Sequence, residues 1–64
     1  MFSFEFFAMR QQEIEDFIDA LATTDDPNDY YNQRAAAAYA RLDLDSLTSD
    51  EVDYIEREVF KRYQ

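Results

Sequence analysis

Cysteine, histidine, tryptophan and glycine are all absent from this 64-residue chain, and proline occurs only once. Without cysteine no disulfide can form, and without cysteine and histidine the usual zinc and iron ligand sets are missing. We therefore expect no metal and no cofactor. The lack of glycine leaves few positions for the tight turns of β-hairpins, which favours helices over strands.

The same absences restrict catalysis. A nucleophile and its base would have to come from serine, tyrosine, a carboxylate or the only lysine, Lys61, which lies in the last predicted helical turn. Carboxylates are abundant, but acid–base catalysis requires an enclosed pocket that separates their pKa values. A chain of this length is not expected to form one. We predict that the protein is not an enzyme.

Basic residues are scarce and unevenly placed. Six of them stand against 15 acidic residues, which gives a net charge of -9. Seven carboxylates and no cation occur between Gln11 and Gln33, and six carboxylates and no cation between Leu42 and Glu56. A surface of this sign repels nucleic acid and anionic lipid but attracts cationic protein surfaces. We expect a basic protein partner, with no direct binding to nucleic acid or to a membrane.

Hydrophobic residues make up 47% of the chain, which is too many for a disordered acidic tail. Residues 1–64 are predicted to form a single domain of the all-α class, a small three-helix bundle. The N-terminal residues lack the basic segment and cleavage site of a signal peptide, and no stretch approaches the roughly 20 apolar residues of a membrane span. We expect a cytoplasmic protein, in the host cytoplasm if a phage encodes it.

The first predicted helix covers residues 4–22. At 3.6 residues per turn its apolar side chains share one arc. They are Phe7, Ile14, Phe17, Ile18 and Leu21. The opposite face carries Glu15, Asp16 and Asp19. The alternation of Phe2, Phe4 and Phe6 is also typical of a strand, but Ser3 can cap a helix, and we favour the helix.

The second predicted helix covers residues 27–42, with Asp26 as N-cap and Pro27 at the first helical position. Its predicted inward stripe consists of Tyr31, Ala35, Ala38, Tyr39 and Leu42. A second stripe, predicted to face outward, consists of Tyr30, Arg34, Ala37 and Arg41.

The third predicted helix covers residues 49–63 and has the clearest start. Thr48 as N-cap and Glu51 three residues later form a capping box, and Leu47 is placed to pack against Val52. The predicted inward face consists of Val52, Ile55, Val59 and Tyr63, with Phe60 beside it. Tyr54 is predicted to project from the polar face. Two ion pairs are predicted at i,i+4 spacing, Asp53 with Arg57 and Glu58 with Arg62.

Two local motifs are weak. Asp43-Leu44-Asp45 begins like an EF-hand loop, but Leu47, Thr48 and Tyr54 occupy positions where calcium binding requires an oxygen ligand, glycine and glutamate. Asp45-Ser46-Leu47 is similar to the motif at which acyl carrier proteins receive phosphopantetheine. That resemblance implies Ser46 as the modified residue, but a carrier domain needs more than the one further helix predicted here. We interpret Asp45 and Ser46 as polar residues of the segment that leads into the Thr48 N-cap.

The acidic side of the first helix is the main candidate site. No basic residue lies between Arg10 and Arg34, so like-charge repulsion there is predicted to be unrelieved. The carboxylates predicted to contact a partner are Glu13, Glu15, Asp16, Asp19, Asp25, Asp26 and Asp29, with Asp43, Asp45, Asp50 and Asp53 as a second patch.

Small acidic helical proteins of this kind resemble the nucleic-acid mimics with which phages and mobile elements inhibit restriction, CRISPR or repair enzymes. The resemblance is one of physical type, because no family motif is matched. It implies an inhibitor that occupies the basic nucleic-acid-binding surface of a partner protein, in the manner of an anti-CRISPR or anti-restriction protein.

The alternative is an acidic interaction module that is not a mimic, such as an antitoxin, an immunity protein or an assembly adaptor. Tyrosine and arginine are favoured interface residues, and a core of this size does not use every phenylalanine. The residues predicted to contact a partner or a second copy in a homodimer are Phe2, Phe4, Phe6, Tyr30, Arg34, Arg41 and Tyr54.

Overall fold

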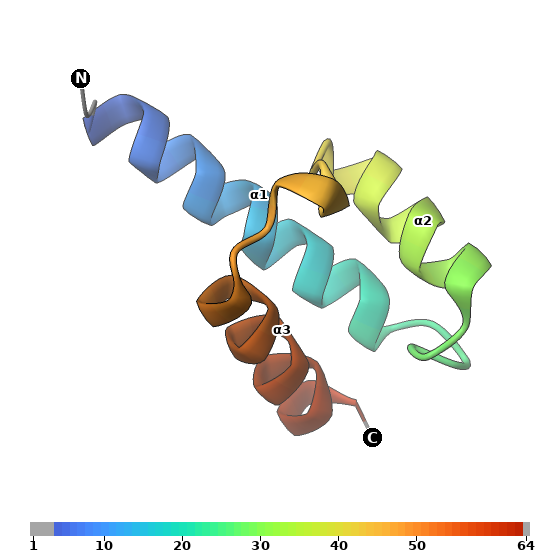
Figure 1. The fold of residues 1–64 in the computed structure, drawn as a ribbon. Coiled ribbons are helices and arrows are strands. Elements are labelled where there is room, and N and C mark those ends of the chain that lie inside the picture. The colour runs from blue at the N-terminus through green and yellow to red at the C-terminus, as the bar shows by residue number, and fades with distance from the viewer. Residues whose placement is uncertain (1–3, 64) are drawn as a thin grey trace.

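The computed structural model describes residues 4–63, with side chains from Met9 onward. Three α-helices pack together, α1 (Phe4–Ala22), α2 (Tyr30–Ala40) and α3 (Ser49–Arg62), and a short 3-10 helix, η1 (Leu44–Ser46), lies between α2 and α3 (Figure 1). Residues 4–63 contain no strand. The all-α prediction is therefore confirmed, and the backbone from Phe4 onward is helical rather than extended. Phe2 and the side chains of Phe4 and Phe6 lie outside the described residues.

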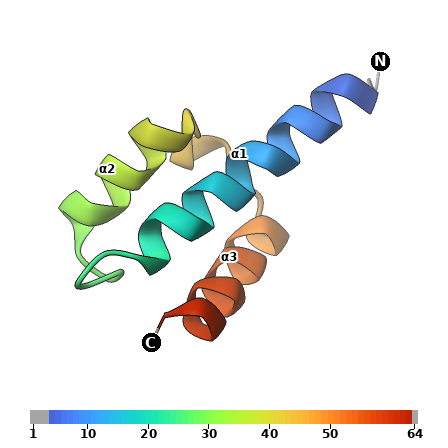
Figure 2. The same cartoon turned by 180° about the vertical axis from the view of Figure 1, so that it is seen from behind.

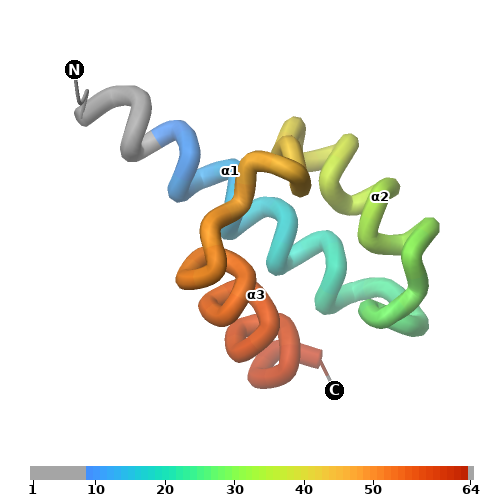
Figure 3. Tube along the Cα trace, in the orientation of Figure 1, coloured from blue at the N-terminus to red at the C-terminus, as the bar shows by residue number. Residues whose placement is uncertain are grey.

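The helix α1 is the centre of the fold. In the views from both sides, α2 and α3 lie on either side of it (Figure 2). The connection between α2 and α3, which includes η1, crosses over α1 on one face (Figure 3). Both α2 and α3 pack along α1, whereas they make little contact with each other. None of the described helices has the length and apolar character that a membrane span requires.

The core lies where the three helices meet. Ile18 of α1 is fully buried, and no polar or charged side chain among the described residues is buried. The other core residues are Ile14, Phe17 and Leu21 of α1, Ala36, Ala37 and Ala40 of α2, Leu42 after it, and Ile55 and Val59 of α3. The predicted apolar arc of α1 is confirmed for its described members. Burial of Ile14, Phe17, Ile18 and Leu21 holds the bundle together.

The start of α2 differs from the prediction. Its N-cap is Asp29, whose carboxylate accepts a hydrogen bond from the Asn32 backbone N–H at 3.2 Å. Asp26 instead accepts from the backbone N–H of Asn28 at 3.0 Å, in a turn that contains Pro27. An aspartate that bonds the N–H two residues later stabilises a turn, and this keeps residues 27–29 out of the helix.

The end of α2 also comes earlier than predicted, at Ala40. Arg41 has φ 59° and ψ 36°, a left-handed conformation that stops a helix. The backbone N–H groups of Arg41 and Leu42 then donate to the carbonyls of Ala38 and Ala37, at 3.3 and 2.9 Å. These bonds satisfy carbonyls that the end of a helix leaves free.

The predicted inward stripe of α2 is wrong for four of its five members. Ala36, Ala37 and Ala40 face the core, whereas Tyr31 and Tyr39 are each 78% exposed. Ala35 and Ala38 are exposed as well, and only Leu42 is buried as predicted. Three methyl side chains let α2 approach α1 closely. Burying both tyrosines would have required partners for two hydroxyl groups.

The prediction for α3 is largely confirmed. Thr48 and Glu51 form the expected capping box. Ile55 and Val59 are buried, but Val52 and Tyr63 are only partly covered, and Phe60 is 83% exposed. The hydroxyl of Tyr63 donates to the carbonyl of Asp25. Of the two predicted ion pairs, the structure shows Glu58 with Arg62 at 3.3 Å but, within the described residues, none between Asp53 and Arg57.

Candidate cation-binding face

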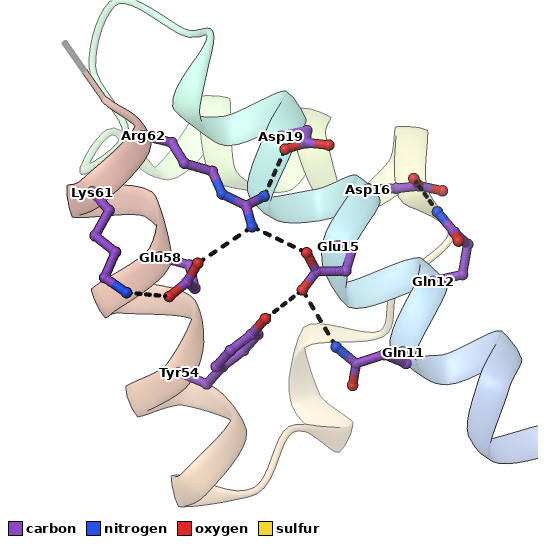
Figure 4. A network of polar contacts seen from close by, with 9 residues as sticks. All are labelled: Gln11, Gln12, Glu15, Asp16, Asp19, Tyr54, Glu58, Lys61 and Arg62. Atoms are coloured by element: carbon purple, nitrogen blue, oxygen red, sulfur yellow. Dashed lines mark hydrogen bonds and ion pairs between the residues drawn. The ribbon is translucent and has the colours of Figure 1, made fainter.

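Side chains of α1 and α3 form a polar network along one side of the bundle (Figure 4). In this network Glu15 and Asp19 of α1 are bonded to Tyr54 and Arg62 of α3, and Arg62 is also bonded to Glu58. We call these residues, together with the neighbouring Asp16, the acidic face. The spacing explains the arrangement, because residues three or four apart lie on the same side of a helix.

Arg62 is the centre of the acidic face. Its Nη1 donates to Oδ1 of Asp19 at 2.7 Å, and its Nη2 lies 3.1 Å from Oε1 of Glu15. The same Nη2 lies 3.3 Å from Oε1 of Glu58. One guanidinium is thus held by three carboxylates from two helices (Figure 4). The predicted repulsion along α1 is therefore relieved by a cation 43 and 47 residues away in the sequence.

Glu15 is the most extensively bonded carboxylate of the acidic face. Besides Arg62, its carboxylate accepts from the Tyr54 hydroxyl at 2.6 Å and from the Gln11 amide at 3.3 Å. The hydrogen bond from Tyr54 is the main cause of a lowered pKa of Glu15, and the same bond raises the pKa of Tyr54. Glu15 is thus held as a carboxylate at neutral pH.

Tyr54 lies on the polar face of α3 as predicted, but its side chain is not free. Its ring is partly buried against the core, and its hydroxyl is bonded to Glu15. It therefore contributes to the packing between α1 and α3, and its role as a contact residue stays a prediction.

The outer edge of the acidic face is open to solvent. Asp16 accepts a hydrogen bond from Gln12 at 2.9 Å and has no cationic partner among the described residues. A shallow hollow of about 420 Å³ lies beside it, lined by Asp16, Asp19, Ala20, Thr23 and Tyr39. Two carboxylates and an aromatic ring around a hollow suit an arginine or lysine side chain.

A second ion pair joins α1 to α3 near the N-terminus of α3. Arg10 donates from Nε and Nη2 to the two carboxylate oxygens of Glu51, at 2.9 and 2.8 Å. It also donates to the hydroxyl and the carbonyl of Ser46, at 3.3 and 3.0 Å. The serine of the carrier-like tripeptide is therefore engaged in a structural contact, and its hydroxyl donates to the Asp43 carbonyl at 2.7 Å.

The other predicted contact carboxylates do not join the acidic face. Those of the second patch, Asp43, Asp45, Asp50 and Asp53, are exposed around η1 and the first turn of α3. Three more lie in the connection between α1 and α2, Asp25, Asp26 and Asp29. Glu13 is partly buried on α1, where its charge acts on Arg10. The structure thus divides the eleven predicted carboxylates into separate groups.

Three of the six basic residues, Arg10, Lys61 and Arg62, are in ion pairs, and these lie on α1 and α3. They engage four carboxylates, Glu15, Asp19, Glu51 and Glu58. Among the described residues, ten carboxylates have no ion-pair partner: Glu13, Asp16, Asp25, Asp26, Asp29, Asp43, Asp45, Asp50, Asp53 and Glu56. The protein therefore concentrates its internal ion pairs on α1 and α3 and presents the remaining negative charge to solvent.

The predicted aromatic and basic surface of α2 is present in part. Tyr30 is 60% exposed, and Arg34 stacks on its ring with 5.5 Å between the guanidinium carbon and the ring centroid. Arg34 also donates to the Tyr30 hydroxyl at 2.9 Å. Arg41 is exposed at the end of α2, but Ala37 is buried in the core and does not belong to this surface.

Comparison with protein-family models, curated proteins and solved structures finds no match for this chain.

Proposed function

We propose that this protein binds the cationic surface of a nucleic-acid-binding protein and excludes nucleic acid from it. The observation that supports the proposal is the environment of Arg62. Three carboxylates of the acidic face hold its guanidinium at 2.7 to 3.3 Å. The same chemistry, applied to a partner's arginines, would occupy the groups that bind phosphate.

The distribution of charge adds to this argument. Among the described residues, ten carboxylates and three cations, Arg34, Arg41 and Arg57, have no ion-pair partner, which leaves a large excess of negative charge on the surface. Such an excess of charge speeds the encounter with a basic surface, and this attraction weakens as the salt concentration increases. Carboxylates three or four residues apart lie about 5 to 6 Å apart at Cβ. This spacing is of the order of the charge spacing in a nucleic-acid backbone.

With this function the protein would be an inhibitor of the type that phages or mobile elements encode, such as anti-CRISPR and anti-restriction proteins. The partner is expected to lose nucleic-acid binding when this protein is bound. A test begins with capture of partners at low and at high salt, from the organism whose cells express the gene. Partners that bind through the acidic face should be retained at low salt and released at high salt.

The variants for this test follow from the ion pairs. Asp16→Asn with Asp19→Asn removes two charges, including the one that pairs with Arg62 at 2.7 Å, and leaves the Tyr54–Glu15 bond in place. Asp50→Asn with Asp53→Asn is the matched control, because it removes the same charge from exposed carboxylates outside the acidic face. The first pair should weaken partner binding by about tenfold or more, since charge-assisted hydrogen bonds are lost. The control should change it much less.

A second candidate is supported by α2. The side chains of Tyr30, Tyr31 and Tyr39 are 60% to 78% exposed, and Arg34 is ordered against Tyr30. Tyrosine and arginine in this arrangement are typical of interface anchors. An interaction module such as an antitoxin or immunity protein would then bind through α2. In that case Tyr30→Ala or Arg34→Ala would abolish binding, and the variant with neutral Asp16 and Asp19 would bind normally.

A further inference from the structure

A groove of about 970 Å³ lies between α2 and α3, on a different side of α1 from the acidic face. Leu21 lines this groove and follows Asp19 by two residues, which places the two side chains on opposite sides of α1. The connection that contains η1 contributes Leu44 and Leu47, and the connection between α1 and α2 contributes Pro27 and Asn28. Both connections therefore border the groove.

The groove is apolar and incompletely covered. Buried residues form its floor, Phe17, Leu21, Ile55 and Val59. Exposed residues of α3 and its C-cap form one wall, with exposed fractions of 37% for Val52, 83% for Phe60 and 38% for Tyr63. Since α2 and α3 barely contact each other, the bundle leaves open the position that a fourth helix would fill.

The charges at the groove have one sign. Of the described residues, Asp26 and Glu56 are the charged ones that line it, and both are exposed without an ion-pair partner in this part of the chain. We propose that this groove binds an amphipathic helix of a partner protein, with apolar residues toward the floor and basic residues toward Asp26 and Glu56. Apolar burial would supply most of the affinity and the two carboxylates would set the orientation.

The dimensions of the groove suit such a helix. From Val52 to Tyr63 its α3 wall extends for about 16 Å, or three helical turns. Apolar residues at i, i+3, i+4, i+7 and i+11 of a bound helix would cover about that length on one face. A second copy of this chain fits this groove less well, because with six basic residues against 15 acidic ones it offers few cations to pair with Asp26 and Glu56.

The test uses a synthetic peptide of about 18 residues, made of leucine and lysine with leucine at helical spacing, long enough for about five helical turns. A peptide of the same composition, with its leucines placed so that no apolar face forms, is the control for charge alone. Binding is followed by methyl chemical shifts in NMR and by calorimetry. We expect a dissociation constant on the order of 10 µM for the amphipathic peptide, with shifts at Leu44, Leu47, Val52, Ile55 and Val59.

Two substitutions locate the site. Phe60→Ala should weaken binding at least tenfold, and because Phe60 is 83% exposed the variant should fold. Met9→Ala is the control, an apolar residue 65% exposed on α1 and outside the groove, and it should leave binding unchanged. Glu56→Lys should also weaken binding at least tenfold at low salt, and this loss should shrink at high salt.

Four results of the binding experiments would overturn the proposal. They are no binding of the amphipathic peptide, equal binding of the control peptide, shifts confined to the acidic face, and equal effects of Phe60→Ala and Met9→Ala. Sedimentation that shows a dimer broken by Phe60→Ala would assign the groove to a second copy and would overturn it as well. The test is independent of the proposed function, because its variants leave Asp16 and Asp19 unchanged.

Discussion

Arg10 of α1 and Glu51 of α3, 41 residues apart, form a two-point ion pair in which Nε and Nη2 donate to separate carboxylate oxygens. Glu51 also accepts from the backbone N–H of Thr48 at 2.9 Å. One side chain therefore both caps α3 and attaches its N-terminus to α1. The hydrogen bond from Arg10 is the largest cause that lowers the pKa of Glu51 to about 2, followed by the Thr48 backbone bond.

The double role of Glu51 predicts unequal effects of two substitutions. Thr48→Ala removes only the cap and should lower the free energy of unfolding by about 1 kcal/mol. Glu51→Ala should lower it by about 2 kcal/mol, since it also leaves Arg10 without its partner. Asp53→Ala, on the same helix but with an exposed side chain, is the control and should change it by less than about 0.5 kcal/mol. Urea unfolding followed by circular dichroism measures all three. Equal effects of Thr48→Ala and Glu51→Ala would contradict the structural role of Arg10.

Acid should destabilise the protein through the same residue. The pKa of Glu51 in the folded state is lowered from 4.5 to about 2, so its contribution is complete above about pH 4.5 and is lost as the pH falls towards 2. Glu15 contributes with the same sign, because its pKa is also lowered. Glu51→Gln should be less stable than the wild type at pH 7 and should lose less stability between pH 4.5 and 2. Melting temperatures measured across that range test this, and parallel curves for the two proteins would contradict it.

The packing of α2 predicts opposite outcomes for neighbouring alanines. Ala37→Leu adds three carbons between α1 and α2 and should cost about 1 to 3 kcal/mol of stability. Ala38→Leu places the same side chain in solvent, because Ala38 is exposed, and should change stability by less than about 0.5 kcal/mol. Thermal unfolding of the two variants measures the difference. A greater loss of stability in Ala38→Leu than in Ala37→Leu would indicate that Ala38 faces the core, as the sequence predicted.

Homodimer formation stays a prediction. The exposed side of α2 carries Tyr31 and Tyr39 with Ala35 and Ala38 beside them, which is a surface that a second copy could cover. Sedimentation equilibrium at micromolar concentration should then give about twice the 7.7 kDa mass of the chain. Tyr31→Ser with Tyr39→Ser should return it to the monomer. A monomer at all concentrations would contradict homodimer formation.

The sequence predicted helices well where the signal depends only on residues that are close together in the chain. The capping box at Thr48 needs only residues within one turn, and the apolar arc of α1 needs only helical periodicity. The same reasoning placed the start of α2 three residues early. Asp26 and Asp29 are both suitable caps, and the choice depends on whether Asp26 bonds Asn28 or a later residue.

Long-range contacts account for the other errors. On α2 alanines and tyrosines occur on every side of the helix, so periodicity alone does not identify the buried face. Packing against α1 determines which face is buried. On α1 the acidic block was interpreted as lacking cations, because Arg62 is distant in the sequence. A sequence-based signal for that contact was available only in part, in the Glu58–Arg62 spacing. The groove between α2 and α3 depends on how the helices diverge, which no local pattern specifies.

Competition between this protein and nucleic acid for a captured partner shows whether the acidic face excludes nucleic acid. A labelled duplex is bound to the partner, and its fluorescence anisotropy is followed as this protein is added at low and at high salt. We predict that the wild type displaces the duplex at low salt, that Asp16→Asn with Asp19→Asn requires about tenfold more protein, and that high salt weakens displacement. A partner that binds the duplex and this protein at the same time, with an affinity unaffected by salt, would contradict the proposed exclusion of nucleic acid.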